Sequence, residues 1–221
     1  MYEDKNYDRC IILYEQVYQH SPKTDEGEVA YYRLAKSYYQ MEDFYMAGYY
    51  FSAYIQRFPY SVKNEEALFL TALCSVQNSP EFSLDQTETL TAINNVQQFV
   101  DRYPGSYLID SCNLIIDQLR YTLALKEYEA VALYDRTENY KAAVAAGEIF
   151  MEHYSRSKFL EEVHYMVVKN SYFMTINSIE SKKSERSSQT IERFRNFAIR
   201  YASSKYLNEL ENYAAALEKI K

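Results

Sequence analysis

One short joint recurs along the chain and limits what it can fold into more than any other feature. It consists of an aromatic residue, a basic residue, a second aromatic residue, a break position and a serine. Four copies are clear: "YIQRFPYSVK" from Tyr54, "FVDRYPGSYL" from Phe99, "FMEHYSRSKFL" from Phe150 and "FAIRYASSKYL" from Phe197. With an earlier copy included, the breaks fall at Pro22, Pro59, Pro104, Ser155 and Ala202. Spacings of 37 to 51 residues are typical of repeated helix pairs that carry insertions.

The segment from Glu28 to Pro59 shows what one repeat contains. Its first part has one apolar helix face, with the i, i+3, i+4, i+7 spacing, at Tyr31, Leu34, Ala35 and Tyr38. A second helix follows "MEDF", and its small and bulky residues recur at fixed offsets from every break. These residues are Cys10, Tyr14 and Val17; Ala47, Phe51 and Tyr54; Ala92, Val96 and Phe99; Ala143, Gly147 and Phe150; Thr190, Phe194 and Phe197. A small residue lets the partner helix approach, and the bulky ones fill the space beside it.

This residue order resembles the tetratricopeptide (TPR) motif over its whole length. We therefore predict an all-α fold, a TPR-like α-solenoid of about five helix-turn-helix repeats that forms a single domain over residues 1–221. First helices are expected at about residues 28–40, 63–76, 107–135 and 159–179, the third as one long helix or two nearly continuous ones. The segment "KYLNELENYAAALEKI" is expected to be the C-terminal capping helix.

Three segments depart from the regular repeat. Residues 77–88, "QNSPEFSLDQTE", are expected to form a proline-containing loop between the two helices of the third repeat. Residues 180–189, "ESKKSERSSQ", are polar throughout and are expected to form an exposed, mobile loop. The first repeat lacks a first helix, so we expect one upstream of the given sequence.

The joint itself is interpreted as structural rather than as a binding motif. Phe99 ends a second helix in the core, and Arg102 lies in the last turn, where a cation suits the carbonyl end. Pro104 stops the helix, Ser106 is placed to cap the next one, and Tyr103 is expected to wedge consecutive repeats together. The matching basic residues are Arg57, His153 and Arg200, and the matching serines are Ser61, Ser157 and Ser204.

Composition and motifs exclude several classes of function. A net charge of -7 disfavours nucleic-acid binding, and no apolar run is long enough for a membrane-spanning helix. The three cysteines are far apart and are expected to be buried hydrophobic residues, not a zinc site or a disulfide framework. The three histidines, His20, His153 and His164, have no metal-ligand spacing, and no catalytic or phosphate-binding motif is present. The sequence therefore predicts no enzyme activity and no cofactor.

The 25 tyrosines are the remaining signal. On the first helix of the second repeat, Tyr32, Lys36 and Tyr39 form a stripe one position round from the core face. First helices line the concave side of a solenoid, so this stripe would face a peptide-binding groove, which tyrosine suits well. The alternative, weighed equally, is that these rings pack against the neighbouring repeat.

Three segments together carry a resemblance to the BamD family of outer-membrane-protein assembly lipoproteins, in a Bacteroidetes-like version. They are "YYRLAKSYYQMEDFYMAGYYFSAYIQRFP", the insertion with "LDQTETLTAINNVQQFVDRYP", and "YEAVALYDRTENYKAAVAAGEIFMEHY". The resemblance implies a periplasmic protein, held at the outer membrane by a lipidated N-terminal cysteine, that docks on the POTRA domains of the barrel protein BamA. It also implies that residues 1–105 receive unfolded outer-membrane proteins and that residues 106–221 dock on BamA.

The sequence also departs from that family. Cys10 follows "NYDR", with no lipobox, so the anchor segment is expected to lie upstream. Where related proteins carry an arginine that supports BamA docking, this chain has "VAAG" at residues 144–147, so no BamA-docking residue is assigned. Two alternatives stay open: another envelope TPR interaction module, or a SusD-like glycan-binding lipoprotein. The latter would need a longer chain and tryptophans, and this chain has no Trp.

Overall fold

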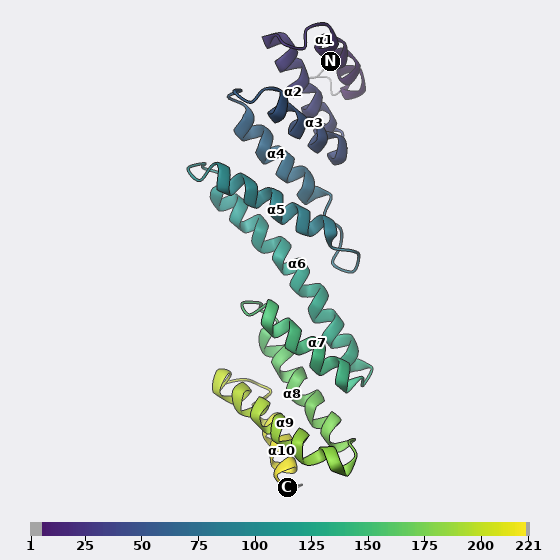
Figure 1. Cartoon of the computed structure of the whole chain (residues 1–221), viewed down its shortest axis with the longest axis vertical. Helices are drawn as coiled ribbons and strands as arrows, with labels where there is room; N and C mark the ends of the chain where they lie inside the picture. Colours follow the sequence, from purple (N-terminus) through teal and green to yellow (C-terminus); the bar gives the residue numbers. More distant parts are fainter. Residues whose placement is uncertain (1–5, 220–221) are drawn as a thin grey trace. The chain divides into compact units, whose positions relative to one another are not determined.

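The protein is helical from end to end within residues 6–219, the part that the computed structural model describes (Figure 1). It forms ten α-helices and no strand over these residues: α1 Tyr7–His20, α2 Asp25–Gln40, α3 Phe44–Arg57, α4 Asn64–Gln77, α5 Thr87–Arg102, α6 Ile109–Arg136, α7 Tyr140–His153, α8 Leu160–Ile176, α9 Glu180–Arg200 and α10 Leu207–Glu218. The predicted all-α, TPR-like arrangement of helix pairs is confirmed, with α10 in the place of the expected capping helix. The helix and anchor expected upstream lie outside the described residues.

The chain divides into two compact units, Met1–Arg120 and Tyr121–Lys221, and the boundary falls within α6. The N-terminal unit has one core around Ala35, Phe51 and Tyr54 and a second around Val96, Phe99 and Cys112. The C-terminal unit has a core in which α6, α7 and α8 contribute Val131, Phe150 and Val167. A further core joins α8, α9 and α10 through Val168, Phe197 and Leu210. The small and bulky residues identified from their offsets therefore pack in the cores of the later repeats, whereas in the first set Cys10 is buried and Val17 is 42% exposed.

The recurring joint has the same geometry in all four clear copies. The serine hydroxyl accepts the backbone N–H of the residue two positions on, at 3.1 to 3.2 Å, from Lys63, Leu108, Phe159 and Tyr206. The second aromatic ring lies 5.0 to 5.5 Å from the aromatic ring one turn earlier in the helix, in the pairs Phe58–Tyr54, Tyr103–Phe99, Tyr154–Phe150 and Tyr201–Phe197. Tyr103 packs against a core built from α4, α5 and α6, so its predicted wedging role is confirmed.

The prediction of a mobile loop at residues 180–189 is wrong, because α9 begins at Glu180. This helix buries small polar side chains instead of apolar ones over its first half. Ser187 and Thr190 are fully buried, and the Thr190 hydroxyl lies 3.2 Å from the hydroxyl of Thr175 on α8. Short hydroxyl side chains bond to the carbonyl one turn back in their own helix, so they can be buried without apolar neighbours in sequence. A search for hydrophobic periodicity cannot detect such a face.

Other expectations from the sequence are confirmed. Residues 78–86 form the predicted loop, which the buried Gln86 amide closes by donating to the carbonyls of Glu81 and Leu84 at 2.8 and 3.0 Å. All three cysteines are free and buried, and burial raises the pKa of Cys74 to about 12. None of the helices in the described part of the chain is both long and apolar enough to cross a membrane.

Candidate peptide-binding surface

The predicted stripe of Tyr32, Lys36 and Tyr39 lies on α2, whose start is fixed by two local features. The Thr24 hydroxyl accepts the N–H of Gly27 at 3.2 Å and caps the helix. A Cβ at Gly27 would lie 1.9 Å from the carbonyl oxygen of Ser21, so only glycine fits this close approach. The α1–α2 joint is therefore tight, and it sets where the rest of α2 meets α3 and α4.

Tyr32 is a core residue, and for this ring the structure shows the packing alternative rather than an open groove. Its side chain is 3% exposed. The ring meets Phe51 and Tyr54 edge to face, with centroids 5.8 and 5.3 Å away. Helix α2 is packed against both α1 and α3, so its buried arc is wider than one amphipathic stripe.

Lys36 lies over this buried ring together with charged groups from the next repeat. Its Nζ is 3.1 Å from Oε1 of Glu66 on α4 and 5.7 Å from the Tyr32 ring centroid. Lys63, at the α3–α4 joint, places its Nζ 4.3 Å from the same centroid. Burial disfavours the Glu66 carboxylate, but hydrogen bonds from Tyr32 and Lys36 and the charge of Lys63 outweigh it, so its pKa is held below the usual range. Two cations and one carboxylate thus share a half-exposed patch.

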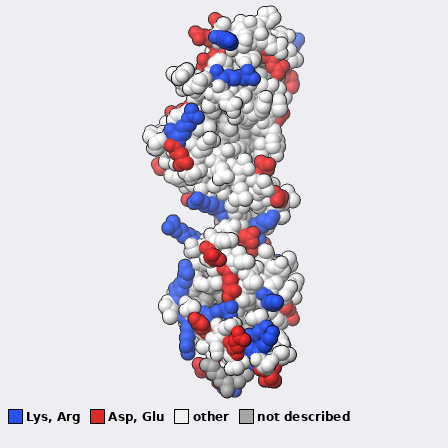
Figure 2. All heavy atoms as spheres, viewed as in Figure 1, with Lys and Arg blue, Asp and Glu red and all other residues white. Residues whose placement is uncertain are grey.

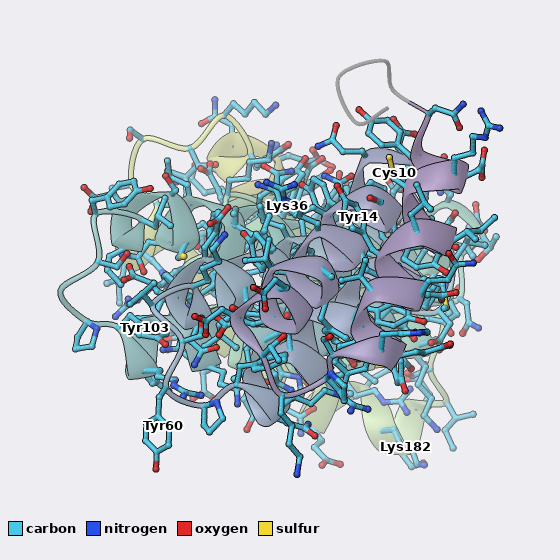
Figure 3. The ribbon with its side chains drawn as sticks, turned by 90° about the horizontal axis from the view of Figure 1, so that it is seen from above. Cys10, Tyr14, Lys36, Tyr60, Tyr103 and Lys182 are labelled. Atoms are coloured by element: carbon cyan, nitrogen blue, oxygen red, sulfur yellow. The ribbon has the colours of Figure 1, made fainter. Side chains whose placement is uncertain are left out.

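Tyr39 is half-buried and lies further along α2. Its ring packs against Phe44 of α3 at 5.5 Å, and burial raises the pKa of its hydroxyl. The three predicted residues are therefore not equivalent: one is in the core, one forms an ion pair and one is partly covered (Figure 3 labels Lys36). Peptide binding by this surface stays a prediction.

Sequence reasoning missed the polar cluster that holds the three helices of this surface together. The hydroxyls of Tyr54 and Ser61 each donate to Oε1 of Glu28 at 2.6 Å, and the two hydroxyls are 2.6 Å apart. The bonds from Ser61 and then Tyr54 hold the pKa of Glu28 below its usual range. Because Glu28 lies in the first turn of α2, Tyr54 in the last turn of α3 and Ser61 just before α4, one carboxylate fixes the relative placement of all three. The recurrence of the joint serine was the available signal.

A hollow of about 300 Å³ opens where α1, α2 and α3 meet, lined by residues that include Tyr18, Tyr31, Tyr50 and Arg57. Nη1 of Arg57 donates to the hydroxyl of Tyr18 at 2.6 Å, and its guanidinium carbon is 5.3 Å from the Tyr31 ring centroid. The joint cation predicted for the helix end therefore also covers two rings of neighbouring helices. A second hollow of about 540 Å³ follows one face of α3, from Tyr49 to Arg57.

The C-terminal unit has a comparable aromatic and charged cluster on its first helices. The hydroxyls of Tyr165 on α8 and Tyr213 on α10 both donate to Oε1 of Glu209, at 3.1 and 2.6 Å. Tyr165 stacks on Tyr206 with centroids 4.1 Å apart, and Lys169 pairs with Asp135 at 3.0 Å. In the view of Figure 2, charged groups are dense over this unit, whereas much of the N-terminal unit is uncharged.

These features define the class of protein: a TPR-like helical-repeat protein with aromatic and charged side chains on its surface. Within residues 6–219, no group of three or more His, Cys, Asp or Glu side chains is placed to hold a metal ion. Residues 1–155 match the model of the YfiO family, described as an outer membrane lipoprotein. The chain belongs to this BamD-like family of outer membrane lipoproteins. No curated protein matches the chain.

Proposed function

We propose that the chain is a non-enzymatic scaffold of the outer-membrane β-barrel assembly machinery, a Bacteroidetes-like BamD. It is lipid-anchored at the periplasmic face of the outer membrane. It docks on the POTRA domains of a BamA-type barrel protein and helps to receive unfolded outer-membrane proteins. The family match over residues 1–155 carries this proposal, because it spans the N-terminal unit and continues through α6 and α7. The helical-repeat fold supports it as a surface for protein contacts.

The charged patch of the N-terminal unit supports a role in binding substrate peptides. Lys36 and Lys63 lie above an aromatic ring; Lys36 pairs with Glu66, and the charge of Lys63 acts on both Glu66 and Glu28. A peptide that ends in an aromatic residue has a free carboxylate, which can compete with Glu66 for Lys36. Tyr39 then supplies a half-exposed ring beside it. The C-terminal unit is proposed to dock on BamA, and no docking residue is assigned to it.

The scaffold role is tested by co-purification of the chain with the BamA-type barrel protein from the same genome. Docking is expected with the POTRA segment alone and without substrate. Failure to bind any POTRA domain would remove the central part of the proposal.

The peptide role is tested separately by titrating the chain with an aromatic-ended peptide and with its C-terminal amide. Lys36→Gln is expected to weaken binding of the free acid by about three- to five-fold, as for a half-exposed ion pair. It should leave the already weaker binding of the amide unchanged. The matched control Lys141→Gln, in the C-terminal unit, should change neither affinity. Equal loss for the acid and the amide would show that Lys36 does not contact the carboxylate.

A further inference from the structure

Each joint between repeats turns the same three positions out to solvent. They are the break position, the residue after it, and the residue that follows the serine, and they are exposed in all four clear copies. In the N-terminal unit three of these six positions hold large apolar or aromatic side chains, and the other three are Pro59, Pro104 and Gly105. Tyr60 is 97% exposed, Val62 is 96% exposed and Tyr107 is 89% exposed. Few side chains of this size are so completely uncovered in a folded protein.

The other joints show that the fold does not require apolar residues there. The position of Val62 and Tyr107 is occupied by Lys158 and Lys205 at the α7–α8 and α9–α10 joints. These lysines are exposed at the same place, beside the same serine hydrogen bond. Exposure is thus set by the joint geometry, whereas the chemistry differs between the joints. Only the α3–α4 and α5–α6 joints, which follow one another in the N-terminal unit, have apolar residues at this position.

These two joints lie at the same edge of the N-terminal unit, on the left of Figure 1. They share an edge because successive helices run in opposite directions. In Figure 3 the side chain of Tyr60 extends away from the ribbon. The residues are protruding tips, and the hollows on this unit are lined by other side chains. A tip without a concave frame is a poor anchor for a peptide, which needs walls around its side chains.

A lipid interface accepts such tips well. Tyrosine is enriched where a membrane meets water, since its ring is apolar and its hydroxyl stays hydrated. Arg102 comes from the second of these joints, and its long side chain can reach headgroup phosphates, whereas Arg57 and Lys63 are held by Tyr18 and over the Tyr32 ring. Asp101 and Asp110 flank the second joint, so insertion of the apolar tips, rather than net charge, has to carry the attraction.

We propose that Tyr60, Val62 and Tyr107 form a lipid-contact edge that rests in the headgroup region of a membrane. The chain belongs to a family of outer membrane lipoproteins, so the expected lipid surface is the outer membrane. This expectation does not depend on any docking partner. An anchored chain samples the surface at high local concentration, so a few tips suffice to orient it. The contact fixes which edge of the N-terminal unit faces the lipid. It leaves the surface around Lys36 and Tyr39 of α2 free.

The absence of tryptophan from the chain permits a direct test. Tyr60→Trp and Tyr107→Trp each introduce a single reporter, and Lys205→Trp is the control at the joint position equivalent to that of Tyr107. Each protein is tethered through an N-terminal histidine tag to a nickel-chelating lipid. The vesicles are of phosphatidylethanolamine and phosphatidylglycerol, with a brominated-chain phosphatidylcholine as quencher. Emission is expected to shift to the blue and to be quenched at positions 60 and 107, and to stay water-like at 205.

Three results would overturn the proposal. Water-like emission at both 60 and 107 in the tethered protein rules out insertion. Equal quenching at 205 shows unspecific adhesion. A shift at 60 that needs an added POTRA-bearing protein, and does not occur on vesicles alone, assigns the edge to a protein partner.

A second set of variants uses the chain's own alternative residues. Val62→Lys and Tyr107→Lys copy the lysine of the C-terminal joints, so the fold is expected to tolerate them. Combined, they should abolish quenching of the Tyr60→Trp reporter at unchanged thermal stability. The control pair, Lys158→Arg and Lys205→Arg, keeps a cation at each C-terminal joint. It should leave the quenching of the Tyr60→Trp reporter unchanged. Quenching that survives the lysine pair would contradict a lipid-contact edge.

Discussion

At position 147 the chain lacks a side chain where the other second helices have Tyr14, Phe51, Val96 and Phe194. The space beside Gly147 is filled by a side chain of the partner helix, α8. A Cβ at Gly147 would lie 2.3 Å from Cγ2 of Val167 on α8. Val167 is 1% exposed and is enclosed by other core residues, so it cannot move aside cheaply. The same repeat position is thus filled either by its own side chain or by that of the partner helix.

Gly147→Ala is therefore expected to destabilise the protein by about 1–2 kcal/mol. Overpacking costs roughly 1–3 kcal/mol, and the better helix propensity of alanine offsets up to about 1 kcal/mol. Denaturant unfolding measures the difference. Gly105→Ala is the matched control, because a Cβ there meets nothing within 4 Å. Adding Val167→Ala to Gly147→Ala should recover part of the loss. If both glycine variants are equally stable, the close approach of α7 and α8 is not a constraint.

His164 is a second residue whose environment has a measurable consequence. Its Nδ1 lies 3.3 Å from the hydroxyl of Tyr201, and Arg200 is close by. Burial, helped by the charge of Arg200, lowers the pKa of His164 from 6.5 to about 4. Between these two values the unfolded chain binds more protons than the folded one. The stabilising contribution is therefore complete above about pH 6.5 and is lost as the pH falls toward 4.

On acidification from pH 7 to pH 5, His164 should account for about 1–2 kcal/mol of lost stability. The measurement is urea unfolding at both pH values for the wild type, His164→Gln and the exposed control His20→Gln. The carboxylates contribute equally in all three, so the loss specific to His164 appears as a shallower pH dependence in His164→Gln alone. Parallel curves for all three proteins would mean that His164 titrates alike in the folded and unfolded states.

At the scale of single helices, the sequence predicted the joints better than the faces between them. Proline, serine and paired aromatics act locally, so their order alone indicates where one helix ends and the next begins. Tyr32 shows the limit. A helical wheel of α2 placed it beside the core face, but α2 packs against helices on both sides, and the ring is buried. Burial depends on neighbours that the local pattern does not contain.

The start of α9 tests the same point experimentally. Ser187 is fully buried with its hydroxyl 3.3 Å from the carbonyl oxygen of Leu217, and the adjacent Ser188 is exposed. Ser187→Asp buries a charge against a carbonyl and should cost about 2–4 kcal/mol. Ser188→Asp should stay within about 0.5 kcal/mol of wild type. Thermal unfolding measures both.

Trypsin gives an independent readout of this segment through Lys182, Lys183 and Arg186. The wild type and Ser188→Asp should resist cleavage there, since a helix does not fit a protease active site without local unfolding. Ser187→Asp should be cut early. Rapid cleavage of the wild type at these three sites would support the loop that composition alone suggested.

At the scale of the whole molecule, each repeat has two kinds of surface: one that packs on the neighbouring repeat and one that is exposed to solvent. Joints and core offsets recur because every repeat must pack on the next. The side chains that joints and first helices turn outward are free to differ, as the lysines and apolar tips of the joints do. Residues that serve function in such a chain are therefore those that differ between equivalent positions of its repeats. Because one sequence contains several repeats, these positions can be compared within the single chain.

Helix α6 is where the two units meet along the chain, and it has 28 residues with no glycine or proline. A continuous helix couples its two ends, because each residue holds backbone bonds to the turns on either side. Stability in repeat proteins propagates through such nearest-neighbour interfaces. We therefore expect the wild type to unfold in one cooperative step, with α6 as the connection between the units.

Arg120→Pro tests this coupling, since Arg120 is exposed and is the last residue of the N-terminal unit. Proline inside a helix removes a backbone bond and costs about 3 kcal/mol or more, and the exposed Arg120 side chain itself belongs to neither core. Far-UV circular dichroism in urea should then show two transitions. Gly147→Ala, added to Arg120→Pro, should shift only the transition of the C-terminal unit. Arg120→Ala, the control, should retain a single transition. One transition in Arg120→Pro would place the coupling outside α6.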